Sequence, residues 1–195
     1  SMPIVGPARL ALGAAIKAAN AARRLIGTVR FRPADNSGVS SLDMQTAAAL
    51  FDYFESCMVA ISFSFKALET YANDMISRRL RTRTITIVHR RKVVELGATE
   101  LERRLSTSEK YALVLPMVLD LSLSKSTRLW QRFRALEKAR DAAVHLKSLE
   151  LQGRGGTVDR ESLFFTMLKE DPREYPRIAI AMMRHFIEVN TEPWL

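Results

Sequence analysis

The chain has 195 residues, of which 47% are hydrophobic and 26% are charged, and its formal net charge is +9. This apolar content excludes a mainly disordered chain. The single Cys57 excludes both a disulfide scaffold and a zinc site built from cysteines. A pI near 10.1 indicates a polyanionic partner, nucleic acid first. No uncharged apolar run approaches the roughly 18 residues that a membrane-spanning helix needs. We therefore expect a cytoplasmic protein with no membrane partner.

Residues 1–40 are expected to form an N-terminal helix and loop, ahead of a helical bundle that spans residues 41–195. Ser1, which precedes Met2, is expected to be a residue left by cloning. Between Arg9 and Arg32 there are six basic residues and no acidic one, a pattern that transit peptides share. The alternative is an ordinary helix over 7–25 that ends at Gly27.

The rest of the chain has the pattern of a helical protein. Apolar residues alternate spacings of four and three from Ala47 to Met75, which predicts one long helix over about 41–80 that packs inside a bundle. The β-branched, alternating run over 81–95 predicts a short strand pair or an extended loop. Further helices are expected over 98–105, 106–121, 128–151, 161–169 and 174–189. Ser106 and Glu109 form a capping box that opens the second of these. The predicted fold class is all-α, an up-and-down bundle of five to six helices with one short extended insertion.

A basic segment follows the long predicted helix. It carries seven cations and no carboxylate: Arg78, Arg79, Arg81, Arg83, Arg90, Arg91 and Lys92. Such a run is often only a solvated face. The alternative is an RNA-binding segment, because clustered Arg and Lys gain affinity for phosphates by releasing condensed counterions. The run contains no aromatic residue to stack on bases, so it does not predict sequence-specific recognition.

A second candidate site lies in the predicted helix 128–151, in the segment Arg140-Asp-Ala-Ala-Val-His145. Arg140 falls within the apolar stripe of that helix, so it must be paired or face an interface. Asp141 lies four residues before His145, where its carboxylate can orient the imidazole. On a regular helix Arg140 and His145 are about 140° apart, so one copy cannot direct both at one phosphate, whereas two copies across a two-fold axis could.

This Arg-Asp-x-x-x-His element resembles the signature of HEPN domains. The segment Phe65-Lys-Ala-Leu-Glu-Thr-Tyr-Ala-Asn-Asp-Met-Ile76 is similar to a segment of HEPN-like bacterial proteins, and the stretches 106–116 and 175–180 fit the same group. The resemblance covers about residues 41–188 and rests on short motifs.

The resemblance implies a metal-independent endoribonuclease of defence, toxin–antitoxin or stress systems, acting as a homodimer. His145 would move the proton at the ribose 2′-OH or the leaving oxygen. Arg140 would stabilise the phosphorane, and Asp141 would hold the imidazole, with a 2′,3′-cyclic phosphate as product. Glu69 and Asn73 share a face of the long helix and are expected to support Arg140.

The same resemblance implies an antitoxin or nucleotidyltransferase as a possible partner. Toxins that such a transferase modifies carry His-x-Tyr, and this chain has Lys147 in place of the tyrosine, which argues against that route.

Other functions remain open. The alternative to an enzyme is a non-catalytic HEPN-like module that binds RNA or docks a protein. A DNA-binding regulator is less favoured, because no helix-turn-helix spacing stands out. Three scattered histidines predict no metal site, and no cofactor is expected.

Overall fold

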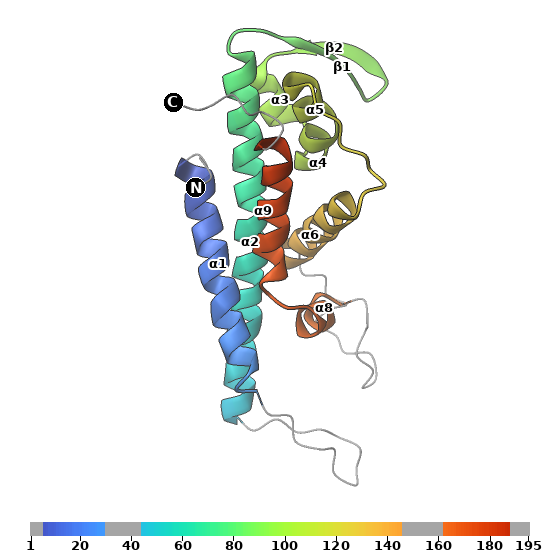
Figure 1. Ribbon diagram of the computed structural model, residues 1–195. Coiled ribbons are helices and arrows are strands. Elements are labelled where there is room, and N and C mark those ends of the chain that lie inside the picture. Colours follow the sequence, from blue (N-terminus) through green and yellow to red (C-terminus); the bar gives the residue numbers. More distant parts are fainter. Residues whose placement is uncertain (1–5, 30–43, 146–161, 188–195) are drawn as a thin grey trace.

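The computed structural model describes residues 6–29, 44–145 and 162–187. It is a mostly α-helical protein with one two-stranded sheet, which confirms the predicted fold class. Two helices form the long axis of the molecule. A smaller group of helices and the hairpin cover one end and one side (Figure 1).

Helix α1 (Gly6–Ile26) packs antiparallel along helix α2 (Met44–Leu80), and both agree with the predicted bounds in the described part of the chain. The buried face of α1 is made of small residues at helical spacing: Ala8, Ala11, Leu12, Ala15, Ala19 and Ala22. Small side chains let the two backbones approach closely, so apolar surface is buried along most of α1. Ala8, Ala11, Ala19 and Ala22 belong to the same hydrophobic core as the buried residues of α2. The expected domain boundary near residue 40 lies outside the described residues.

The run after α2 folds as an antiparallel hairpin, strand β1 (Ile85–His89) with strand β2 (Lys92–Leu96), which settles the alternatives in favour of a strand pair. Its inner face buries Ile87 and Leu96. The outer face exposes the cross-strand pair Val88 and Val93. Helix α3 (Ala98–Arg104) follows directly and packs under the hairpin end of α2.

The segment predicted as one helix over 106–121 is helical but not regular. The expected capping box is present, because Ser106 Oγ accepts from Glu109 N and Glu109 Oε2 accepts from Ser106 N at 2.8 Å. Helix α4 (Thr107–Glu109) then passes into a π-helical turn η1 (Lys110–Val114) and helix α5 (Leu115–Leu119). Asp120 ends the segment in the left-handed region, with φ 52°.

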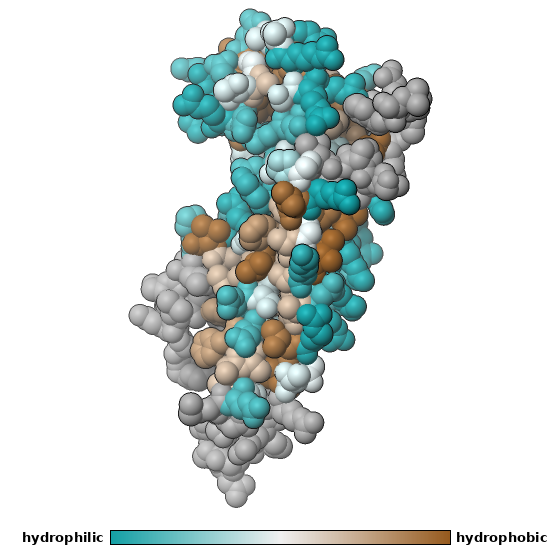
Figure 2. Space-filling model, turned by 90° about the vertical axis from the view of Figure 1, so that its left-hand side faces the viewer, coloured by the Kyte–Doolittle hydropathy of each residue, from teal (hydrophilic) through white to brown (hydrophobic). Residues whose placement is uncertain are grey.

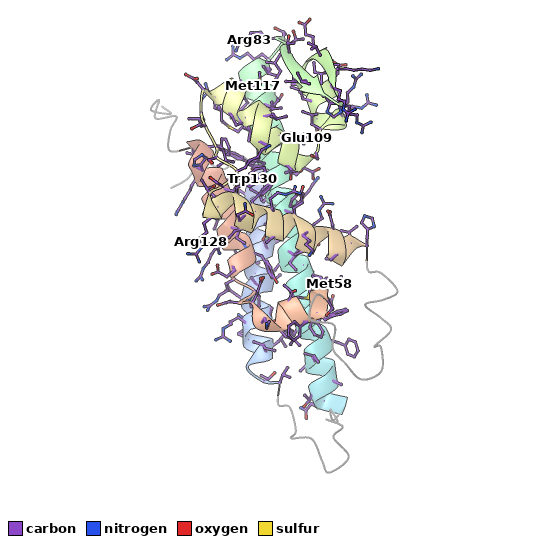
Figure 3. The ribbon with its side chains drawn as sticks, turned by 90° about the vertical axis from the view of Figure 1, so that its right-hand side faces the viewer. Met58, Arg83, Glu109, Met117, Arg128 and Trp130 are labelled. Carbon is purple, nitrogen blue, oxygen red and sulfur yellow. The ribbon has the colours of Figure 1, made fainter. Side chains whose placement is uncertain are left out.

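Helix α6 (Arg128–Val144) crosses α2 obliquely instead of running alongside it (Figures 1 and 3). Its expected end at residue 151 is wrong. His145 has already left helical geometry, with φ −119° and ψ 62°, and residues 146–151 lie outside the described ones. Val144 and His145 are weaker helix formers than the two alanines before them, which is consistent with an end at this point.

The last two helices close the core. Helix α8 (Leu163–Lys169) begins at the Ser162 cap, and helix α9 (Glu174–Ile187) packs against α2 and α6. The predicted start of α8 at Glu161 and the predicted end of α9 at Val189 lie outside the described residues.

Phe133 of α6 lies at the centre of the core, with its ring centroid 5.3 Å from that of Tyr111 and 5.2 Å from that of Trp130. The core thus joins all of the long helices.

One described helix, Gln45–Leu80, is long and apolar enough by length and composition to cross a membrane. Of its most apolar window, 33% is buried inside the protein. The helix is apolar on its buried face and also on part of its exposed face, where Phe51 and Phe63 reach solvent.

Candidate functional site

The basic segment comes together at one end of the molecule. Arg78 and Arg79 lie in the last turn of α2, Arg81 and Arg83 in the connection to β1, and Arg90, Arg91 and Lys92 at the tip of the hairpin. We call these seven residues the basic end. Figure 3 labels Arg83 beside the hairpin, and Figure 2 shows mainly hydrophilic side chains over this end of the molecule.

The hairpin turn holds two arginines in a conformation that side chains disfavour. His89 pairs with Lys92, so Arg90 and Arg91 are the two turn residues, and their φ angles are 50° and 65°. A two-residue turn with both φ angles positive is typically made by Asn-Gly. Each left-handed non-glycine residue costs roughly 1–2 kcal/mol. The turn is therefore less stable than an Asn-Gly turn would be, and it holds two cations at the exposed tip of the hairpin.

Most cations of the basic end form no ion pair within the described ranges. Arg78 Nε pairs with Asp74 Oδ2 at 2.7 Å, and within the described ranges it is the only one of the seven in an ion pair. Arg83 instead donates from Nη2 to the carbonyl oxygen of Arg79 at 2.7 Å, which ties the connection back to α2. Two acids lie at the hairpin: Glu95 of β2, whose Oε1 accepts from Thr84 Oγ1, and Glu109, whose Oε1 lies 3.5 Å from His89 Nδ1. The result is a surface of positive charge carried on a short ribbon.

Arg140 has a different environment, half-buried where α6 crosses α2. Its Cζ lies 4.3 Å from the centroid of the Phe65 ring, and its Nη1 pairs with Asp141 Oδ1 at 3.1 Å. Its Nε is buried and has no hydrogen-bond partner. The prediction that an arginine inside the apolar stripe must be paired is thus confirmed. The aromatic partner was not foreseen, although Phe65 stood in the predicted α2 packing pattern.

The expected contact between Asp141 and the His145 imidazole is not formed. The Asp141 carboxylate pairs with Arg140 instead. Asp141 contacts His145 through the backbone, where the Asp141 carbonyl oxygen accepts a hydrogen bond from His145 N at 2.9 Å. His145 is exposed at the end of α6. The prediction failed because it assumed that the helix continued beyond His145.

The expected support of Arg140 by Glu69 and Asn73 is also wrong. The side chains of Glu69 and Asn73 bind two lysines instead. Glu69 Oε2 pairs with Lys66 Nζ at 2.9 Å, and Asn73 Oδ1 accepts from Lys110 Nζ at 2.8 Å. Glu69 still lines the same hollow as Arg140. The spacing along α2 was right, but the nearest cations come from α2 itself and from η1.

Lys110 is a buried cation that sequence reasoning missed. It is 2% exposed, and its amine also donates to the carbonyl oxygen of Glu102 at 3.0 Å. Burial lowers the pKa of the Lys110 amine, while the nearby Glu69 and Glu102 oppose that change. No local sequence signal marks it, because its burial depends on the π-helical turn.

Hollows flank α2 and α6. One of about 330 Å³ is lined by Phe63, Phe65, Lys66, Glu69, Arg140 and Val144. A second, of about 590 Å³, lies between α2 and α8 and is lined largely by apolar side chains, among them Phe51, Met58 and Phe164. A third, of about 500 Å³, lies between α6 and the α8–α9 connection, where Arg132 pairs with Glu174. Within the described ranges no three His, Cys, Asp or Glu side chains form a group that could hold a metal ion.

No family model, curated protein or solved structure matches the chain. The HEPN resemblance therefore rests on the residues alone.

Proposed function

We propose that the protein binds RNA through its basic end, the surface formed by the end of α2 and the tip of the hairpin. The observation that carries this proposal is the turn, where Arg90 and Arg91 occupy left-handed positions that Asn-Gly would fill at lower cost. Strained residues of this kind tend to mark functional sites. The neighbouring cations, which have few carboxylates beside them, supply more phosphate ligands.

The mode of binding follows from what the surface contains. Guanidinium and ammonium groups bind phosphates of any sequence and gain affinity from counterion release. The exposed hydrophobic residues at the hairpin are Val88 and Val93, which offer no ring to stack on bases. We therefore expect binding that is strong at low salt, weak at high salt and nearly independent of sequence.

The direct test is the affinity for a single-stranded RNA of mixed sequence, measured by fluorescence anisotropy. Changing Arg90→Asn together with Arg91→Gly should preserve the turn and weaken binding by about ten-fold or more at moderate salt, because two phosphate contacts are lost. The matched control is Arg23→Gln with Arg24→Gln, which removes the same charge from the last turn of α1. Equal weakening by both pairs would contradict the proposal, since the effect would then come from net charge alone.

A second candidate function is cleavage of the bound RNA by an HEPN-type mechanism, and one observation favours it. The Arg140 guanidinium rests on Phe65 at the wall of an open hollow, with a buried Nε that has no partner, and His145 is exposed at the end of the same helix. His145 would accept the 2′-OH proton or return one to the leaving oxygen. Arg140 would stabilise charge on the phosphorane.

The cleavage candidate is tested with purified protein and total RNA in EDTA. We expect cleavage that leaves a 2′,3′-cyclic phosphate, and a rate that falls by about 100-fold or more in His145→Ala, as the loss of a general acid–base group requires. His185→Ala is the matched control, because His185 lies on α9 and contacts the carbonyl of Ser122. Cleavage that persists in His145→Ala would rule out this candidate and leave RNA binding as the function.

A further inference from the structure

The hollow between α2 and α8 combines aromatic rings with one carboxylate, and we call it the aromatic hollow. Its volume is about 590 Å³, and its walls include Phe51, Phe54, Phe63 and Phe164 together with Met58 and Glu55. Figure 3 labels Met58 near α8. Small-molecule sites span roughly 300–1,000 Å³. The aromatic hollow is therefore large enough for a small organic ligand.

The rings of the aromatic hollow are accessible to such a ligand. Phe51 is 74% exposed and Phe63 is 42% exposed. Phe54 of α2 and Phe164 of α8 pack edge to face, with ring centroids 4.8 Å apart, so they hold the two helices together at the hollow. An aromatic ring attracts a cation placed over its face. The rings thus suit an apolar ligand that carries a positive charge.

Glu55 places a negative charge beside these rings. It follows Phe51 by four residues on α2, so the two side chains are neighbours on one face of the helix. Glu55 is exposed, and within the described ranges it has no ion-pair partner. Asp52, a second exposed acid, lies three residues before it. This surface is locally acidic in a chain whose net charge is +9.

The neighbouring hollow contains the kind of contact that the aromatic hollow lacks. The two hollows share Ser62 and Phe63. In the neighbouring hollow Arg140 Cζ lies 4.3 Å from the centroid of the Phe65 ring, so a cation of the chain itself rests on the ring. Among the described residues, no Lys, Arg or His lines the aromatic hollow.

We propose that the aromatic hollow binds a small organic cation, an amine or quaternary ammonium group on an apolar body. Its charge lies between the Glu55 carboxylate and the exposed rings, and its apolar body packs on Met58 and the phenylalanines.

RNA and a bilayer fit this surface less well than a small cation does. Asp52 and Glu55 repel phosphates, so the aromatic hollow is separate from RNA binding at the basic end. By length and composition α2 could cross a membrane. A bilayer would place the Glu55 carboxylate in an apolar medium without a counter-ion, which is costly. A small cation supplies that counter-ion.

The test is isothermal titration calorimetry of the full chain with two probes of the same shape and opposite charge, each measured separately. The cation tetraphenylphosphonium should bind at one site, although the net charge of the chain favours the anion tetraphenylborate. Glu55→Gln should weaken binding of the cation by about ten-fold, because the counter-charge is lost. Phe51→Leu keeps an apolar side chain and should weaken it by about two- to five-fold, as the loss of a cation–π contact requires.

Glu100→Gln is the matched control, because it removes one exposed carboxylate from α3 and should leave the affinity unchanged. No binding of tetraphenylphosphonium, or equal affinities in wild type, Glu55→Gln and Phe51→Leu, would overturn the proposal. Tetraphenylborate binding that Phe51→Leu weakens to the same extent would also overturn it, since the hollow would then accept any apolar body. The Arg90→Asn, Arg91→Gly variant should bind tetraphenylphosphonium as wild type does, so this site and the RNA-binding function can fail separately.

Discussion

Lys110 is the residue whose environment departs furthest from what its type prefers. Its amine lies in the interior between α2 and α3, where Asn73 Oδ1 and the carbonyl oxygen of Glu102 accept its hydrogen bonds. A buried cation must be fully hydrogen-bonded to be tolerated. Lys110 therefore fixes the π-helical turn against α2.

The lowered pKa of Lys110 predicts a pH dependence of stability. Below the folded-state pKa the amine is charged in both states, and the cost of burying it is fully present. As pH rises from there toward 10.5, the unfolded chain binds this proton more tightly than the folded one, so the folded state gains stability. The free energy of unfolding of wild type, measured in urea relative to Lys110→Met, should therefore rise with pH in that window. A constant or falling difference would contradict the assigned environment.

The environment of Arg140 was predicted in part from the sequence. Its position in the apolar stripe correctly required a partner, but the chosen partners Glu69 and Asn73 were wrong. Which side chains reach an arginine depends on how α6 crosses α2, and helical spacing does not contain that angle. Asp141 is adjacent in sequence and takes the guanidinium because it needs no tertiary contact to do so.

At the scale of elements, local signals predicted most of the fold. Helix caps and apolar periodicity gave the bounds of α1 and α2, and alternating β-branched residues gave the hairpin as one of two readings. The π-helical turn within 106–121 and the end of α6 at Val144 were missed. Both depend on packing, since the turn accommodates buried Lys110 and its neighbours.

The hairpin turn makes a prediction about stability as well as binding. Changing Arg90→Asn with Arg91→Gly places at the two left-handed positions residues that adopt them at lower cost, and should raise the free energy of unfolding by about 1–2 kcal/mol. For a chain of this length that corresponds to a rise in Tm of about 2–8 °C, measurable by calorimetry. The same variant should bind RNA more weakly. An unchanged or lowered Tm would show that the turn is not strained.

At the scale of the whole molecule, charge and apolar surface are separated. The basic end lies at the hairpin, whereas the exposed apolar residues of α2 lie farther down the helix, beside α6 and α8 (Figure 3). From Lys66 to Arg79 the helix rises about 20 Å.

The central claim is that cations of the basic end contact RNA phosphates. The most direct measurement is the slope of log Kd against log salt concentration for single-stranded RNA, in wild type and in the Arg90→Asn, Arg91→Gly variant. Each lost phosphate contact on a single strand should reduce the slope by about 0.7, so the variant should be shallower by about 1.4, while the Arg23→Gln, Arg24→Gln control keeps the wild-type slope. A variant slope equal to that of wild type would contradict the claim.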